Sequence, residues 1–173
     1  HFGVGKNMVA SMKHWALVTG TIEAIDHQTF FTTEFGKRIF SNRGLDPFLE
    51  EKGTLWLLHW KIASNAERAT TWFWVFNHFA LGYLDRETLI REIALFSQSL
   101  ENTRATNATI KRDIDCFFRT YVPAHDRSAK VSEDSLECPL SELELIVPTS
   151  VKGGYEFRRG PQESLPDWVL NYA

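Results

Sequence analysis

The chain has 173 residues, of which 43% are hydrophobic and 13% aromatic, and its formal net charge is −3. A chain of this length and composition can bury a sizeable core, which excludes a disordered protein. The negative net charge argues against a uniformly basic nucleic-acid-binding protein. Cys116 and Cys138 lie in no metal-ligand spacing, so we expect no disulfide, no metal and no other cofactor.

The sequence predicts no membrane crossing. Its longest apolar stretch, residues 72–80, is interrupted by Asn77 and His78, and a membrane span needs roughly 20 apolar residues. The first residues also lack the charged start and apolar stretch of a signal peptide. We therefore expect a cytoplasmic protein, a location that suits two free thiols.

The chain begins with a predicted helix. Apolar residues at helical spacing, starting with Met8 and Met12, predict an amphipathic helix over residues 6–19, and Gly20 ends it. Met8 and Met12 are expected on its buried side.

A β-hairpin is predicted to follow this helix. Residues 21–25 and 29–33 have the composition of two short strands around a polar turn. A short helix over residues 34–40 comes next. We interpret residues 1–45 as a winged-helix-like element.

An aromatic block follows, over residues 46–100. Two segments, 54–63 and 69–79, are apolar on nearly every side, which predicts two buried helices at the centre of the fold. Asp85 is then a predicted cap for a helix over residues 86–97.

The last block, residues 101–173, predicts a second helix-turn-helix-like element and a C-terminal helix with a hairpin. Thr106 is the expected cap of a helix over residues 107–121. The other predicted elements are a short helix at 139–143 and strands at 145–147 and 155–159 around a turn at 152–154. The fold class is thus mainly α with short β-hairpins (α+β), with winged-helix-like elements packed around an aromatic helical core in one compact unit.

The first candidate DNA-binding element is the N-terminal helix with its hairpin. A helix directly followed by a hairpin is the order found in winged helices, in which the helix enters the major groove of DNA. Lys6 and Lys13 would meet phosphates or guanine edges, Asn7 would pair with adenine, and Ser11 and His14 would reach the backbone. The alternative is a solvated basic helix face.

The second candidate is the segment 108–114, which resembles the recognition helix of DeoR-type helix-turn-helix regulators. The alternative is a bundle helix whose Lys111 and Arg112 pair with Asp115 and Asp113. The candidate DNA contacts on this helix are Thr109, Lys111, Arg112 and Arg119.

The third candidate is the last hairpin, with Lys152 at its tip and Arg158 and Arg159 at its end. Adjacent residues of a strand point to opposite faces, so at most one of the two arginines can contact the phosphates of one DNA strand.

Catalytic groups are scarce in the sequence. His59 and His78 lie on the aromatic helices, and a histidine held in the core is the commoner explanation for such positions. Neither a triad nor a metal-ligand cluster is present. We therefore expect that the protein is not an enzyme, and a hydrolase or nuclease using the two histidines is the weakest hypothesis.

Several segments resemble one bacterial family. They are residues 3–9 with Trp15, residues 55–60 and 76–79, and later residues 109–117 and 157–161. Together they are similar to the family catalogued as Domain of Unknown Function 4007. Its members tend to be encoded beside enzymes that resemble phosphoadenosine-phosphosulfate reductases, in DNA phosphorothioation and phage-defence clusters.

The resemblance implies a DNA-binding or scaffolding accessory protein. The leading hypothesis is winged-helix-type recognition of duplex DNA for a modification or defence complex. The alternative is a protein–protein adaptor that docks a sulfur-transfer or modification enzyme, such as a phosphoadenosine-phosphosulfate-reductase-like partner. The stretch 133–144, with five acidic and no basic residues, motivates the alternative.

Overall fold

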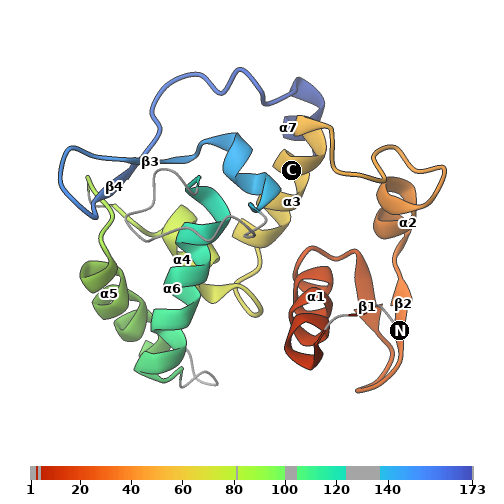
Figure 1. Ribbon diagram of the computed structural model, residues 1–173, viewed down its shortest axis with the longest axis horizontal. Helices are drawn as coiled ribbons and strands as arrows, with labels where there is room; N and C mark the ends of the chain where they lie inside the picture. The colour runs from red at the N-terminus through yellow and green to blue at the C-terminus, as the bar shows by residue number, and fades with distance from the viewer. Residues whose placement is uncertain (1–2, 4, 81, 100–104, 124–136, 173) are drawn as a thin grey trace. The chain divides into compact units, whose positions relative to one another are not determined.

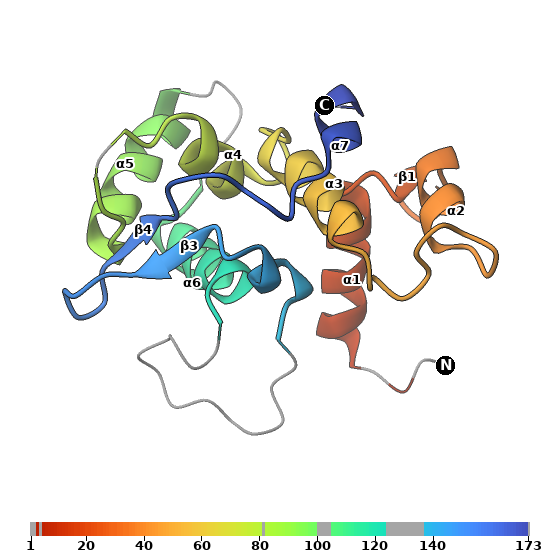
Figure 2. The ribbon, with the colours of Figure 1, turned by 90° about the horizontal axis from the view of Figure 1, so that it is seen from above.

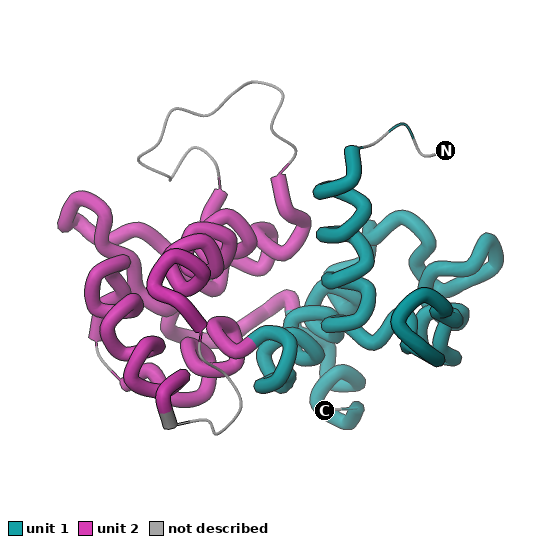
Figure 3. Tube along the Cα trace, turned by 90° about the horizontal axis from the view of Figure 1, so that it is seen from below, with its two compact units in different colours: residues 1–69, 165–173 teal, residues 70–164 magenta. Residues whose placement is uncertain are grey.

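The computed structural model describes residues 3, 5–80, 82–99, 105–123 and 137–172. The chain forms two compact units, which Figure 3 colours separately: unit 1 is residues 1–69 with 165–173, and unit 2 is residues 70–164. The described elements are helices and two antiparallel hairpins, which confirms the mainly α fold with short β-hairpins. The division into three blocks at residues 45 and 100 stays a prediction.

Unit 1 contains four helices and one hairpin among its described residues. These are α1 (Lys6–Val18), β1 (Ile22–Ala24), β2 (Phe30–Thr32), α2 (Glu34–Phe40), α3 (Lys52–Ala63) and α7 (Asp167–Tyr172), all labelled in Figure 1. The hairpin places Glu23 opposite Phe31. Its turn is closed by the Asp26 carboxylate, which accepts the backbone N–H groups of Gln28 at 2.7 Å and Thr29 at 2.8 Å.

The predicted N-terminal helix is present, but its apolar side is not buried. Gly20 follows the helix end with a φ of +67°, the left-handed conformation that glycine supplies after a helix. Met8 and Met12 are 56% and 55% exposed, so their expected burial was wrong. Of the residues of α1, Val18 alone is fully buried.

Helix α2 lies close to the base of the hairpin. The Thr33 hydroxyl accepts the backbone N–H of Gly36 at 3.0 Å and donates to the Gly20 carbonyl at 2.6 Å. An added Cβ at Gly36 would lie 2.2 Å from the Thr21 carbonyl oxygen. Glycine is therefore required for this approach between helix and strand.

The core of unit 1 is built on α3, whose residues 53–58 are all buried. The loop before it is organised by the buried Asp46 carboxylate, which accepts the backbone N–H groups of Glu50 at 2.8 Å and Glu51 at 3.1 Å. Burial alone would raise the pKa of Asp46. These bonds, with one from the Thr54 hydroxyl, hold it below its usual value.

Helix α7 packs against α3, and Figures 1 and 2 both show the two side by side. Helix α7 is not predicted by the sequence. Its six residues are too few to show a helical periodicity.

Unit 2 is a helical assembly with the second hairpin. Its described elements are α4 (Thr70–Asn77), α5 (Arg86–Ser99), α6 (Asn107–Tyr121), the 3-10 helix η2 (Pro139–Leu143), β3 (Ile146–Pro148) and β4 (Tyr155–Phe157). Helices α5 and α6 run beside each other (Figures 1 and 2). Both predicted caps are confirmed, because Asp85 accepts the Thr88 N–H at 2.9 Å and Thr106 accepts the Thr109 N–H at 3.2 Å.

Aromatic rings form the core of unit 2. The Phe76 ring lies 5.7 Å from Phe117 and 5.0 Å from Tyr121, and Phe118 lies 4.6 Å from Tyr155. Close ring pairs of this kind contribute about 0.5–1.5 kcal/mol beyond their burial. They join α4, α6 and β4 into one core.

Candidate nucleic-acid interface

The most exposed element that bears predicted contacts is α1. All nine residues from Lys6 to His14 are exposed, so the side chains of Asn7 and Ser11 reach solvent as expected. The Lys13 ammonium lies 4.2 Å from the centre of the Phe30 ring. This cation–π contact ties the helix to the hairpin that follows it.

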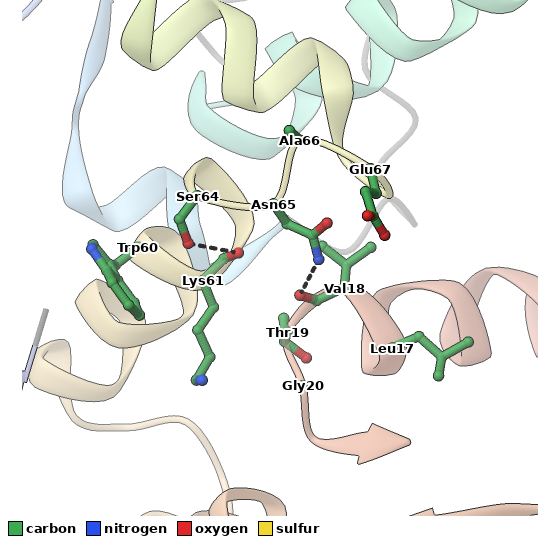
Figure 4. Close-up of a pocket in the computed structure, with 10 residues that line it drawn as sticks. All are labelled: Leu17, Val18, Thr19, Gly20, Trp60, Lys61, Ser64, Asn65, Ala66 and Glu67. Carbon is green, nitrogen blue, oxygen red and sulfur yellow. Dashed lines mark hydrogen bonds between the residues drawn. The ribbon is translucent and has the colours of Figure 1, made fainter. Parts of the chain in front are cut away.

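The other end of α1 is anchored beside a hollow of about 490 Å³ in unit 1 (Figure 4). The Asn65 side chain donates to the Val18 carbonyl at 3.2 Å, a bond drawn in Figure 4. The hydroxyls of Thr19 and Thr21 donate to the carbonyls of Trp15 and Ala16, at 2.8 and 3.0 Å. The carbonyls of the last helical turn, which have no N–H partner within the helix, thus accept other hydrogen bonds. Helix α1 is therefore held at its C-terminal end, while its first half stays exposed.

Helix α6 carries the second predicted set on its outer side. Ile110, Ile114 and Phe117 are buried, so these apolar residues at helical spacing face the core. The predicted contacts Thr109, Lys111, Arg112 and Arg119 are all exposed.

An ion pair that the sequence does not predict adds a positive charge to this face. Arg86 of α5 reaches Asp115 at 3.0 Å and stacks its guanidinium 4.8 Å from the Phe118 ring. Asp115 therefore pairs with Arg86, and the expected alternative partner, Lys111, is not its ion-pair partner. Because the two residues are 29 positions apart, helical spacing gave no signal for this pair. Because the Arg86 guanidinium neutralises the Asp115 carboxylate, the outer face of α6 is more positive than the sequence of α6 alone suggests.

The last hairpin holds the third predicted set. Lys152 and Arg159 are exposed. Arg158 forms an ion pair with Glu144, and its backbone N–H donates to the Leu145 carbonyl at 3.0 Å. Arg158 would have to leave this carboxylate to contact DNA.

The acidic stretch is described in part. Glu133 and Asp134 lie outside the described residues, whereas Glu137, Glu142 and Glu144 are exposed.

The two histidines of the weakest hypothesis differ in environment. Burial lowers the pKa of His59 to about 4, and its ring packs edge-on to Trp56 at 5.7 Å. His78 is exposed and packs beside Phe73 and Phe96, at 5.3 and 5.4 Å. His59 belongs to unit 1 and His78 to unit 2.

Within the described ranges, no group of three or more His, Cys, Asp or Glu residues is arranged to hold a metal ion. None of the described helices is both long and apolar enough to span a membrane.

Comparison with known proteins decides the family. A family model described as a protein of unknown function (DUF4007) matches residues 1–173, the whole sequence. The chain belongs to the DUF4007 family. The resemblance found in the sequence is thereby confirmed. The DUF4007 description names no enzymatic activity, and no curated protein sequence matches the chain.

Two solved structures resemble this DUF4007 chain. A crystal structure of SspB matches with a TM-score of 0.85, and a magnesium ion-bound crystal structure of SspB with 0.87. Both are 30% identical to the chain over 99% of its length. The chain spans 53% of the length of each SspB chain.

Proposed function

We propose that this protein binds duplex DNA as an accessory protein of a bacterial DNA phosphorothioation or phage-defence system. The observation that carries the proposal is the exposure of α1 from Lys6 to His14, with two lysines and no acidic residue. Exposed cations and small polar side chains on a helix fit the phosphates and base edges of a major groove. The modification or defence context comes from the family resemblance.

Two further features support the proposal. The hairpin β1–β2 follows α1 directly, the order of a winged helix, and Lys13 links the two through Phe30. Helix α6 adds a second exposed basic face, on which Arg86 offsets Asp115. Since phosphate contacts dominate affinity for DNA, local positive faces are compatible with a negative net charge.

The test is fluorescence-anisotropy binding of the full chain to a mixed-sequence duplex and to its phosphorothioate-modified counterpart, across salt. We expect affinity to fall steeply with salt. The double variant Lys6→Glu/Lys13→Glu should bind more weakly, and the slope of log affinity against log salt should decrease by about 1 for each phosphate that the variant no longer neutralises. A difference in affinity between the unmodified and the phosphorothioate-modified duplex would show that the protein recognises the modification.

A single charge reversal elsewhere in unit 1 is the control, compared with the single variants Lys6→Glu and Lys13→Glu. Lys52→Glu changes an exposed lysine at the start of α3, where a carboxylate suits the helix dipole, and should leave the slope unchanged. An unchanged slope in the Lys6→Glu/Lys13→Glu protein would remove α1 from the interface. The same experiment with Lys111→Glu/Arg112→Glu tests α6.

The adaptor hypothesis rests on a different observation. Met8, Val9 and Met12 form an exposed apolar face on α1, each about half exposed or more, and such a face suits a protein partner. No DNA binding at low salt, together with stable association with a sulfur-transfer enzyme, would favour the adaptor.

A further inference from the structure

Unit 1 contains a groove of about 630 Å³ between α2, α3 and α7. This volume lies within the range of small-molecule sites, about 300–1,000 Å³. Three aromatic residues line it, Phe35, Trp168 and Tyr172, together with the polar side chains of Arg38, Glu51 and Asn171. None of these residues belongs to the proposed duplex interface.

The aromatic wall comes mainly from α7. Trp168 and Tyr172 lie one helical turn apart and are 52% and 48% exposed. The indole of Trp168 lies so close to Gly53 of α3 that an added Cβ there would be 2.4 Å from its Cζ2 atom. Tyr172 packs edge-on against Trp60, 5.9 Å away. Both rings are thus fixed by packing and still present half of their surface to solvent.

The polar part of the groove combines the Arg38 guanidinium with hydrogen-bonding groups, and the Lys61 ammonium lies against the aromatic wall, 4.4 Å from the centre of the Phe35 ring and 5.6 Å from that of Tyr172. Arg38 is the single basic residue among those lining the groove, and it is exposed. Glu51 immediately precedes α3 and makes no side-chain cap bond, and the Asp46 carboxylate accepts its backbone N–H at 3.1 Å. The same loop keeps Leu49 at a φ of +59°, a conformation that costs a residue other than glycine free energy. Two residues of this loop, Leu45 and Glu51, line the groove.

We propose that this groove binds a nucleobase that carries a phosphate, either as a free nucleotide or as an unpaired nucleotide of a DNA strand. The base would stack on the Trp168 and Tyr172 rings, because every base has an aromatic face. Arg38 would meet the phosphate. Glu51 and Asn171 would bond the polar edge of the base, which offers both donors and acceptors.

The polar side chains distinguish this ligand from a wholly apolar one. An apolar peptide helix in the groove would bury Arg38, Glu51 and Asn171 without partners, which is costly. A nucleotide satisfies the cation and the hydrogen-bonding groups and still uses the aromatic wall. This nucleotide site is separate from the proposed duplex interface. The nucleotide proposal and the duplex proposal can therefore each fail while the other holds.

The experiment titrates the full chain with deoxyadenosine monophosphate by calorimetry and with a fluorescein-labelled oligothymidine strand by anisotropy. Inorganic phosphate serves as the probe without a base. Trp168→Ala should weaken binding about 5- to 160-fold, the range expected when one base no longer stacks on an aromatic ring, and Arg38→Glu should weaken it as well. The matched controls Leu170→Ala and Lys37→Glu, exposed neighbours on α7 and α2 outside the groove lining, should leave it unchanged.

The outcomes separate the possible occupants. Binding of the monophosphate assigns a nucleotide site, and binding of the strand alone assigns an unpaired segment of DNA; both support the proposal if Trp168→Ala weakens them. The proposal is overturned if neither the monophosphate nor the strand binds, or if Trp168→Ala leaves their affinity unaltered. It is also overturned if inorganic phosphate binds as tightly as the nucleotide. A dimer in sedimentation that Trp168→Ala and Leu170→Ala both dissociate would instead assign the face to a second copy. If the Trp168→Ala protein unfolds at a lower temperature than the Leu170→Ala protein, the arginine variant decides. The proposal then holds if Arg38→Glu binds the nucleotide more weakly than Lys37→Glu, and fails if the two bind equally.

Discussion

The stability of the protein should depend on pH through His59. Burial lowers the pKa of this imidazole from 6.5 to about 4, so the folded protein keeps it neutral where the unfolded chain takes up a proton. The contribution of His59 is therefore fully present above pH 6.5 and is lost as the pH falls from 6.5 towards 4. Since each pH unit corresponds to about 1.4 kcal/mol per proton, the loss reaches about 3 kcal/mol at pH 4.

Chemical denaturation between pH 7 and pH 4 measures this effect. His59→Leu removes the titrating group and keeps an apolar side chain of similar size at the site. The wild-type free energy of unfolding should fall by about 3 kcal/mol more than that of the variant over this range. Carboxylates that titrate in both proteins cancel in the difference. The reasoning fails if the two proteins lose stability in parallel, or if NMR shows the His59 ring titrating near 6.5.

Two predictions concern the framework of unit 1. Gly36→Ala should cost about 1–3 kcal/mol or more, because its Cβ would lie 2.2 Å from the Thr21 carbonyl oxygen; a thermal melt equal to that of the wild type would contradict this close approach. Asp46→Asn should cost about 1–3 kcal/mol by replacing the acceptor of the Glu50 and Glu51 N–H groups, measured by denaturation at pH 7. Because the folded pKa of Asp46 is lowered, its contribution is present above the ordinary pKa of 3.8 and lost as the pH falls through the folded value, so wild type and variant should converge in acid.

Local sequence signals predicted most elements, because their causes are local. Thr106 and Asp85 marked helix starts through side chains that bond N–H groups three residues later. Gly20 marked a helix end because glycine adopts a positive φ there at little cost. Helix α7 escaped prediction since its contact with Gly53 of α3 is distant in sequence.

The candidate sites were harder to predict than the elements, because they depend on contacts between elements. Helical spacing correctly placed Lys111 and Arg112 on the outer face of α6. It could not reveal that Arg86 pairs with Asp115, which decides the charge of that face. The groove of unit 1 likewise gave no motif, since Arg38 and Trp168 are brought to it by separate helices.

The salt dependence of binding distinguishes the two proposed roles, DNA binding and protein binding, because the exposed half of α1 carries both lysines and apolar residues. Its lysines favour phosphate, and binding through them weakens as counterions compete. Its apolar residues Met8 and Met12 favour a protein surface, and apolar burial persists or strengthens in excluded salts such as sulfate. A DNA complex should therefore respond in its salt slope to Lys6→Glu, whereas an adaptor complex should respond to Met8→Ala and Met12→Ala with little change in slope. Both faces belong to one helix anchored by Asn65, so comparing the two kinds of variant decides which face α1 uses.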